Sequence, residues 1–226
     1  MLIRISYPLE TRSPLYPGTP PPSVAPFHTI GKGHASSSST ITFNTHSGTH
    51  IDAPSHFCPG GANVADLLGS EARFSPLLII DLPRSGDACI TPGDLTPFLP
   101  LLREARAILV RTGSCKQRIE DPEGYATLHP WIQPELPDIL RRHGPRLTLF
   151  GVDTISISSP NHREEGRECH RAFLCGSPPL LLIEDLDLSD PRLTGSRFQL
   201  RVYPWFRHAL DGVPVVAIAE GPKRDM

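Results

Sequence analysis

The chain has 226 residues, of which 38% are hydrophobic and 20% charged, a composition that is typical of a globular protein and excludes a disordered or fibrous one. Its 22 Lys and Arg against 24 Asp and Glu give a formal net charge of −2, which argues against nucleic-acid binding because that needs clustered excess basic charge. No apolar run reaches the roughly 18 residues of a membrane helix, and no secretory signal is visible, so we expect a protein that does not enter membranes.

Residues 1–39 are expected to form an irregular, proline-rich arm. Residues 13–26 hold six prolines, which favour an extended and stiff backbone. A free linker would not need apolar side chains such as Tyr16 and Phe27, so we expect the arm to pack on the domain or on a partner subunit. No internal repeat or second-domain linker is visible, and residues 1–226 are therefore predicted to form a single domain.

Short apolar or β-branched runs outnumber helical patterns in the rest of the chain. Buried strands are predicted at residues 40–45, 77–82, 107–111, 147–152, 180–183, 198–202 and 213–219. Helices are predicted at residues 92–104, 133–143 and 167–174. This pattern predicts an α/β or α+β fold with a mixed sheet and few helices.

The segment THSGTHIDAPSHF at residues 45–57 carries the strongest chemical signal. It places His46, His50, Asp52 and His56 within eleven positions and separates them mostly by small residues. Imidazole nitrogen and carboxylate oxygen are ligands of zinc, manganese and iron, and one carboxylate can hold two ions. We therefore expect a metal site, with a histidine-rich loop satisfied by ordinary hydrogen bonds as the weaker alternative.

These side chains can meet only if the backbone folds back on itself. In one straight strand His46 and Asp52 would lie about 20 Å apart, at roughly 3.3 Å per residue. Bonds from zinc to nitrogen or oxygen are only about 2.0–2.2 Å long. Gly48 lies between the two residues and has no Cβ, so the sequence predicts a turn near Gly48 and Thr49.

Further ligands must come from elsewhere, and acidic and histidine residues follow the strand predicted at 147–152. The candidates are Asp153, His162, Glu164, Glu165, Glu168, His170, Glu184 and Asp185. His170 lies in a predicted helix, and Glu184 ends an apolar run, where a buried carboxylate needs compensation. Their positions alone leave the choice among them open.

Several other kinds of site are disfavoured by missing motifs. The sequence has no G-x-S-x-G, no G-x-x-x-x-G-K-[ST] and no G-x-G-x-x-G, which argues against a nucleophile-elbow hydrolase and a phosphate-binding loop. The five cysteines, an odd number without a C-x-x-C pair, predict reduced thiols and a cytoplasmic protein.

The segment HSGTHIDAPSHF has every residue of the pattern H-x-G-T-H-x-D-x-P-x-H and thus resembles the signature of the cyclase family. That family includes bacterial kynurenine formamidases and isatin hydrolases. The opening ISYPLETRSPLYPGTPP and three later blocks resemble the family in the same order: RTG at 111–113, GVDTISISS at 151–159 and DGVPVVAIA at 211–219. The resemblance covers most of the chain.

This resemblance implies a swivelling β/β/α-type fold and a metal-dependent hydrolase that assembles as a homodimer or homotetramer. It implies that five residues are metal ligands, namely His46, His50, Asp52, His170 and Glu184. They would hold one or two divalent ions, zinc in the first place and manganese in the second, with Asp52 able to bridge a pair. The distal block HRAFLCGSPPLLLIEDL is slightly longer than the family pattern, and a turn at its Ser-Pro-Pro can absorb the difference.

The resemblance further implies that His56 is the catalytic acid/base, which moves a proton from a metal-activated water to a leaving nitrogen. The implied reaction is hydrolysis of a carbon–nitrogen bond in a small aromatic amide. The preferred substrate is N-formylkynurenine, which an arylformamidase converts to kynurenine and formate. Trp131, Phe57, Phe27 and Tyr16 are available to stack on an aromatic ring.

Three alternatives stay open. An isatin-like cyclic amide would use the same site, and the longer distal block is compatible with a non-catalytic metal-binding relative. A facial triad of His50, Asp52 and one distal histidine would suit iron-dependent oxygen chemistry. That alternative leaves His46 and His56 without a role.

Overall fold

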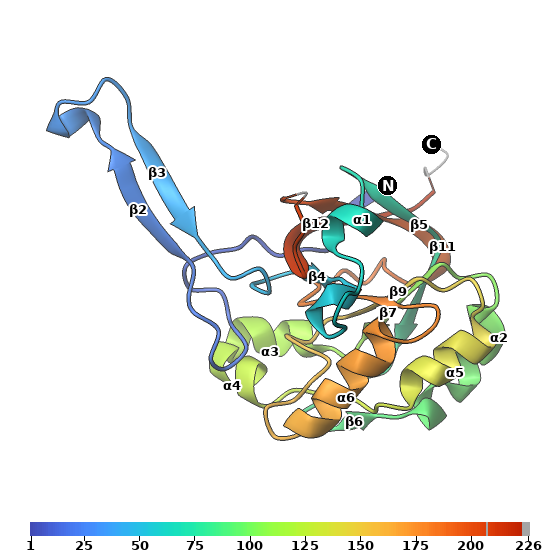
Figure 1. Ribbon diagram of the computed structural model, residues 1–226. Helices are drawn as coiled ribbons and strands as arrows, with labels where there is room; N and C mark the ends of the chain where they lie inside the picture. Colours follow the sequence, from blue (N-terminus) through green and yellow to red (C-terminus); the bar gives the residue numbers. More distant parts are fainter. Residues whose placement is uncertain (207, 223–226) are drawn as a thin grey trace.

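The chain forms a mixed sheet that closes on itself, with helices packed along its outer side and a hairpin that projects from the body (Figure 1). The computed structural model describes residues 1–206 and 208–222. The strands are β1 (Leu2–Arg4), β2 (Ser23–His28), β3 (Ser38–Thr42), β4 (His50–Asp52), β5 (Ala72–Asp81), β6 (Cys89–Ile90), β7 (Ala107–Arg111), β8 (Trp131–Ile132), β9 (Leu149–Val152), β10 (Leu181–Glu184), β11 (Gly195–Pro204) and β12 (Gly212–Glu220). The α-helices are α1 (Val64–Leu67), α2 (Leu99–Leu102), α3 (Ser114–Glu120), α4 (Pro122–Thr127), α5 (Leu136–His143) and α6 (Arg163–Leu174). Short 3-10 helices lie at Ile30–Lys32, Pro54–His56 and Pro92–Phe98.

Seven strands form a closed barrel in the order β12, β11, β5, β7, β9, β10 and β4. The barrel closes because the three-residue strand β4 pairs with β10 on one side and with the beginning of β12 on the other. The pairs β5–β7, β7–β9 and β9–β10 are parallel, and the other pairs of the barrel are antiparallel. The prediction of a mixed sheet in an α/β fold is therefore confirmed, whereas the closure of the sheet was not predicted.

Successive residues of the central strands face two different cores. On β5, Leu77 and Ile79 belong to the cluster that fills the barrel. Leu78 and Ile80 belong to a second cluster with residues of α2, α5 and α6, which cover the outer face of the barrel. Strands that are buried on both faces have nearly continuous apolar sequences, and this is why β5, β7, β9 and β10 could be predicted.

Short or interrupted elements were predicted poorly. The strands β1, β2, β4, β6 and β8 and the helices α1, α3 and α4 were missed because a periodic pattern needs a longer run. The helix predicted at 92–104 is a 3-10 helix followed by the single turn of α2, and Pro97 inside it lacks the backbone donor that an α-helix requires. The described residues therefore contain more helices than the few expected.

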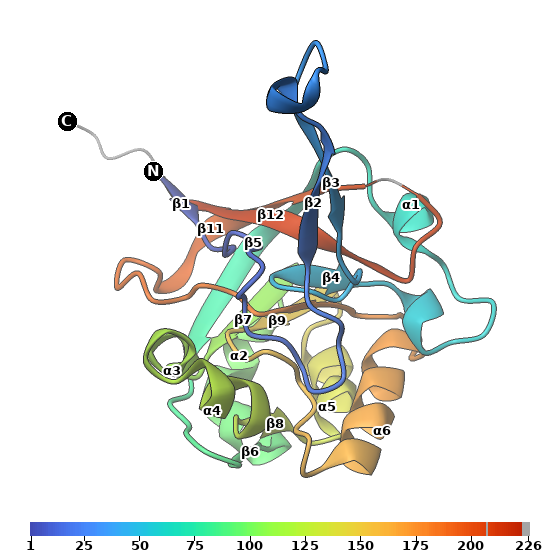
Figure 2. The ribbon, with the colours of Figure 1, turned by 90° about the vertical axis from the view of Figure 1, so that its left-hand side faces the viewer.

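The N-terminal arm is more regular than predicted. Within residues 1–39, β1 pairs with the end of β12, and β2 pairs with β3 in the hairpin that rises from the body (Figure 2). The expectation of an irregular arm was therefore wrong for these strands. Phe27, expected as an anchor, lies on the hairpin with 66% of its surface exposed, together with exposed Val24 and Ile41.

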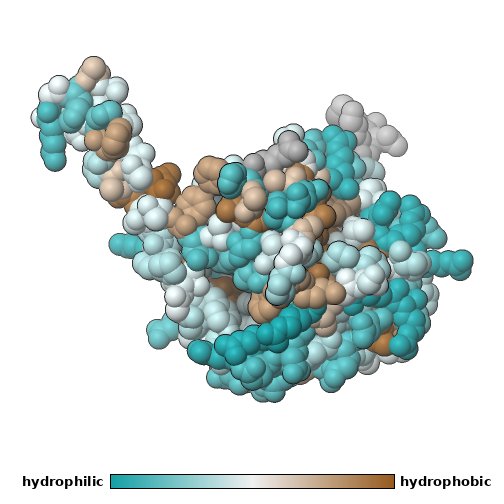
Figure 3. Space-filling view, viewed as in Figure 1, coloured by the Kyte–Doolittle hydropathy of each residue, from teal (hydrophilic) through white to brown (hydrophobic). Residues whose placement is uncertain are grey.

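Hydrophobic side chains gather where the hairpin leaves the body, as the space-filling view shows (Figure 3). Phe43 lies there with its ring centroid 5.8 Å from that of Trp205 and 6.0 Å from that of Phe206. Trp205 and Phe206 are both about half exposed. Among the described residues, no helix has the length and apolar character needed to cross a membrane.

Two cysteines are joined in a disulfide, contrary to the prediction of reduced thiols. Cys58, just after the 3-10 helix at Pro54–His56, bonds to Cys175 at the end of α6, 117 positions later. Cys89, Cys115 and Cys169 are free. The pairing depends on how the barrel brings two distant segments together, so the spacing of the cysteines could not reveal it. The expected cytoplasmic location stays a prediction.

Breaking this disulfide should destabilise the fold. Cys175→Ser is expected to lower the free energy of unfolding by about 2–4 kcal/mol, because the bond closes a long loop in the unfolded chain. Thermal unfolding with and without a reducing agent measures the effect, and Cys89→Ser, which changes a free thiol, is the control. A reducing agent that leaves the melting temperature of the unmutated protein unchanged would contradict this prediction.

Candidate functional site

A tight turn ahead of β4 brings His46 back to Asp52. Asn44 accepts hydrogen bonds from the backbone N–H groups of His46 and Ser47, through its side chain at 2.9 Å and its carbonyl at 3.1 Å. Gly48 follows with a φ of +65°, in the left-handed region that glycine adopts without steric cost. As a result His46 Nδ1 lies 2.9 Å from Asp52 Oδ1. The predicted turn at Gly48 is confirmed.

The strand β4 presents its two functional side chains on one face. Because side chains alternate along a strand, His50 and Asp52 share a face, while Ile51 points into the barrel core. Glu184 on β10 is paired with His50 and projects beside it. Gly212 on β12 is paired with Asp52, and its lack of a side chain leaves room for the His46 ring. The closing strand of the barrel is therefore also the floor of the site.

His50 and His170 each point their Nε2 atom toward carboxylate oxygens. His50 Nδ1 donates to the backbone carbonyl of Gly48 at 2.9 Å, and His170 Nδ1 donates to that of Gly166 at 2.8 Å. In the neutral rings Nε2 then carries a lone pair. His50 Nε2 lies 3.2 Å from Asp52 Oδ1 and 3.5 Å from Glu184 Oε2. His170 Nε2 lies 3.5 Å from Glu184 Oε1 and 3.9 Å from Asp52 Oδ2.

Two hydrogen bonds fix the position of the Glu184 carboxylate. Its Oε1 accepts a hydrogen bond from the backbone N–H of Ile157 at 2.7 Å and from Ser156 Oγ at 3.1 Å. The slightly longer chain between His170 and Glu184 lies outside α6 and β10, in the connection between them. The two side chains still meet, so the extra length does not separate them.

Asp52 lies at the centre of the cluster and is only 1% exposed. Its Oδ1 faces His46 and His50, whereas Oδ2 is buried without a hydrogen-bond partner. Burial raises the pKa of this carboxyl, but the charges of His50 and His46 outweigh that effect and lower it. A buried carboxylate oxygen with no donor is costly, and this one faces the nitrogen of His170.

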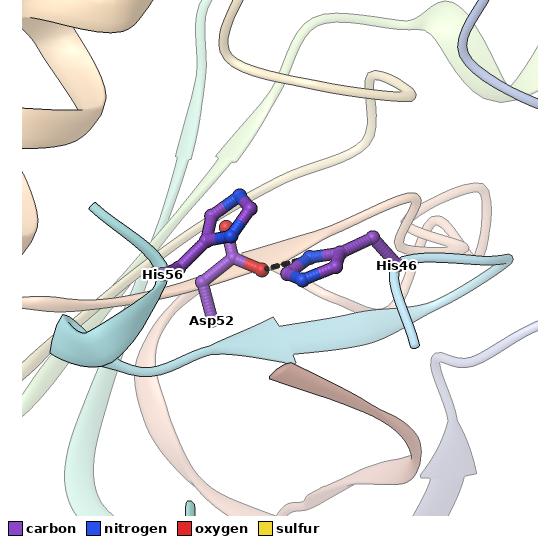
Figure 4. Close-up of side chains that lie close together, drawn as sticks. All are labelled: His46, Asp52 and His56. Atoms are coloured by element: carbon purple, nitrogen blue, oxygen red, sulfur yellow. Dashed lines mark hydrogen bonds and ion pairs between the residues drawn. The ribbon is translucent and has the colours of Figure 1, made fainter. Parts of the chain in front are cut away.

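The donor set fits a divalent cation. Two groups of three side chains bring their ligand atoms within 4.8 Å of one another, namely His46, Asp52 and His56 in one group and His50, Asp52 and Glu184 in the other. Imidazole lone pairs opposite carboxylate oxygens repel unless a proton or a metal ion lies between them. Figure 4 shows Asp52 on β4 between His46 and His56. The cluster could therefore hold a metal through side chains that converge from β4, β10, the turn at His46 and the 3-10 helix at Pro54–His56.

Asp211 belongs to the site although it was not predicted as a site residue. Its Oδ2 lies 2.9 Å from His46 Nε2 and 3.1 Å from His56 Nδ1, and the two stacked rings have centroids 4.0 Å apart. The sequence offered only an indirect signal, since Asp211 begins the block DGVPVVAIA that was noted for its family resemblance. A carboxylate that bonds two imidazoles fixes the orientation of both.

The two rings on Asp211 differ in basicity. Burial opposes the protonation of His46, but the carboxylates of Asp52 and Asp211 outweigh it and raise its pKa to about 10. Burial also lowers the pKa of His56, and there the attraction of Asp52 does not compensate for burial and for repulsion from His46 and His170. In this arrangement His56 is the imidazole that remains neutral and able to accept a proton.

Several candidate ligands lie away from the cluster. Asp153 accepts hydrogen bonds from the backbone of Thr112 and Gly113. Asp185, with a φ of +54°, is bound by Arg118 at 2.7 and 2.9 Å and by the Tyr125 hydroxyl at 2.7 Å. Glu164, Glu165 and Glu168 are exposed on α6, and His162 bonds to Asp87.

A pocket of about 400 Å³ opens over the cluster. Beyond the cluster it is lined by Tyr16, Pro17 and Thr19 of the arm, by Asn44, Phe57, Ile155, Ser156 and Ser158, and by Arg163 and Arg167 of α6. Two of the predicted aromatic residues, Tyr16 and Phe57, therefore face the pocket. Trp131 does not line it and stacks on His162, with centroids 4.3 Å apart, and Phe27 lies out on the hairpin.

The chain is similar in sequence and in fold to members of one protein family. The Cyclase family model matches residues 3–159. Kynurenine formamidase of Geobacillus thermodenitrificans is 30% identical over 215 residues, which are 95% of this chain and 95% of that protein. Isatin hydrolase A from Labrenzia aggregata superimposes with a TM-score of 0.78 at 18% identity, over 97% of this chain and 93% of that one. A potential metal-dependent hydrolase with cyclase activity has a TM-score of 0.74 at 22% identity, over 99% and 98% of the two chains.

The close approach of β12 to His46 gives a test of the site. A Cβ on residue 212 would lie 2.5 Å from His46 Cε1, so Gly212→Ala must displace the ring. We expect this variant to bind zinc roughly 10–100-fold more weakly, as measured by competition with a chelating dye. Gly31→Ala, at a position with nothing within 4 Å, is the control. Equal zinc affinity for the two variants would show that His46 does not hold the ion.

Proposed function

This chain belongs to the cyclase family, and from that membership and its histidine–carboxylate cluster we propose that it is a metal-dependent hydrolase of amide carbon–nitrogen bonds. The observation that carries the proposal is the buried Asp52, whose Oδ1 faces nitrogens of His46 and His50 and whose Oδ2 faces a nitrogen of His170. Zinc is the preferred ion and manganese the alternative. That the closed barrel with its outer helices is of the swivelling β/β/α type, as the resemblance implies, is part of this proposal.

Five side chains would hold the metal: His46, His50, Asp52, His170 and Glu184. Asp52 has Oδ1 toward His46 and His50 and Oδ2 toward His170, so it would bridge if two ions are bound. A bound divalent cation supplies a Lewis acid that polarises the amide carbonyl and lowers the pKa of water. The protein contributes the fixed positions of the ligands, two of which are oriented by backbone carbonyls.

His56 would transfer the proton. The carboxylate of Asp211 accepts from His56 Nδ1–H and thereby leaves Nε2 as the basic nitrogen. Nε2 would accept the proton of the attacking water and return it to the leaving nitrogen. Because the pKa of His56 is lowered, the ring is neutral near pH 7 and can begin this cycle as a base.

The preferred substrate is an N-formyl arylamine, with N-formylkynurenine converted to kynurenine and formate. The side chains of Phe57, Tyr16, Pro17 and Ile155 give the pocket an apolar wall for an aromatic ring. The curated relative in Geobacillus thermodenitrificans is a kynurenine formamidase. A cyclic amide such as isatin is the second candidate, because an isatin hydrolase has the same fold.

We also propose that the chain assembles as a homodimer or homotetramer. The hairpin exposes Val24, Phe27, Ile30 and Ile41, which a monomer would leave in water. Light scattering in solution should give the mass of two or four chains, and the mass of one chain would reject the assembly.

The ligand and proton-transfer roles can be separated in two variants. His56→Ala should retain its bound zinc and lose about 10²–10⁴-fold in kcat for N-formylkynurenine, because only the proton transfer is removed. Asp52→Ala should lose the metal itself. Elemental analysis and turnover are measured on the same samples. A metal-free His56→Ala protein would make His56 a ligand, and a fully loaded Asp52→Ala protein would refute the central role of Asp52.

Asp211→Asn tests the orientation of His56. The amide keeps the shape of the carboxylate but cannot bind two N–H groups through one charged oxygen, so kcat should fall roughly 10–100-fold. Asp138→Asn, which changes an exposed carboxylate on α5, should behave like the unmutated protein. Unchanged turnover in Asp211→Asn would remove Asp211 from the mechanism.

A further inference from the structure

Helix α6 presents two arginines to the pocket in addition to its metal-site histidine. Arg163, Arg167 and His170 all line the pocket, at spacings of four and three residues. Residues so spaced occupy one face of an α-helix. The same helix face therefore runs from the metal cluster to a cationic rim of the pocket, which Tyr16 and Thr19 of the arm also line.

This rim carries positive charge that the protein only partly neutralises. Arg167 pairs with Glu164 at 2.5 Å on the exposed side of the helix. Arg163 donates from Nε to the backbone carbonyl of Pro160 at 3.2 Å, and no acidic side chain of the described residues lies within 4.0 Å of it. Among the residues that the structure describes, the acidic side chains that line the pocket are Asp52 and Glu184 of the cluster itself. An anion at the rim would thus meet the Arg163 guanidinium without competition from a neighbouring carboxylate.

The helical spacing of Arg163 and Arg167 from His170 indicates how far from the reacting group a substrate would carry such an anion. At 1.5 Å of rise per residue, Arg167 lies about 4.5 Å and Arg163 about 10.5 Å along the helix from His170. The backbone positions of the two arginines are therefore displaced along α6 from His170 by up to about the length of an aromatic ring with its substituents. The planar guanidinium can bind a carboxylate through two parallel N–H donors.

We propose that Arg163 and Arg167 bind a carboxylate at the end of the substrate remote from the scissile amide, and so select anionic aryl amides over neutral ones. This inference rests on the proposed amide hydrolysis and adds the charge of the substrate to it. The two arginines are specificity residues, since they contact the remote substituent and not the reacting atoms.

A matched pair of substrates tests the proposal. 4-Formamidobenzoate carries its carboxylate across the ring from the formamide, and 4-formamidobenzamide is its neutral counterpart. The unmutated enzyme should favour the carboxylate in kcat/KM by roughly tenfold or more, and Arg163→Gln should remove most of this preference through KM. The loss in kcat/KM should be larger for the carboxylate than for its neutral counterpart. Arg171→Gln, which alters an exposed arginine of α6 that does not line the pocket, is the control.

Binding of the products separates this proposal from the proposed function. If neither substrate is turned over, amide hydrolysis of this class fails, and calorimetry with 4-aminobenzoate and 4-aminobenzamide still tests the arginines. The carboxylate should bind about tenfold more tightly, less so at high salt because the rim is exposed. The Arg163→Gln and Arg167→Gln double variant should bind both compounds alike. Equal binding by the unmutated protein, or a preference that survives in the double variant, would overturn the proposal.

Discussion

The buried carboxylate of Asp52 is the constraint on which the site depends. An ionised carboxylate that is 1% exposed is tolerated only if positive charge or hydrogen-bond donors compensate for the lost water. Here the compensating groups are imidazoles from a turn, a strand and a helix, and one carboxylate oxygen has no partner among them. A divalent cation would satisfy that oxygen and the facing lone pairs together. If a metal binds there, its binding free energy would also contribute to the packing of three distant segments.

Buried acids elsewhere in the fold show what a structural carboxylate looks like by contrast. Asp185 is surrounded by the Arg118 guanidinium and the Tyr125 hydroxyl, and Asp153 by backbone N–H groups and the Thr112 hydroxyl. Their hydrogen bonds come from protein donors, and these bonds hold the ends of the central strands in place. Asp185 follows Glu184 directly in the sequence, yet only Glu184 faces the imidazoles of the cluster. The distinction between a ligand and a brace lies in the donors that each side chain meets.

Local sequence predicted the centre of the site well. The density of small residues and the glycine in 45–57 predicted that His46 would return to Asp52, because both effects act within one turn of backbone. The meeting of His170 and Glu184 came from family resemblance. Asp211, the disulfide and the closure of the barrel were missed because each joins segments more than a hundred positions apart. No periodicity in the chain records such contacts.

The shortest strand of the barrel also limits how this protein can change. In β4 the two outer residues serve the cluster, and the middle one fills the core. A shift of one position along β10 and β12 would place an isoleucine among the side chains of the cluster and two polar groups in the apolar interior. An insertion or deletion in this strand would therefore disrupt both the packing of the barrel core and the arrangement of the cluster. We expect substrate preference to change through the segments that form the mouth of the pocket, because their residues are held neither by the barrel core nor by the cluster.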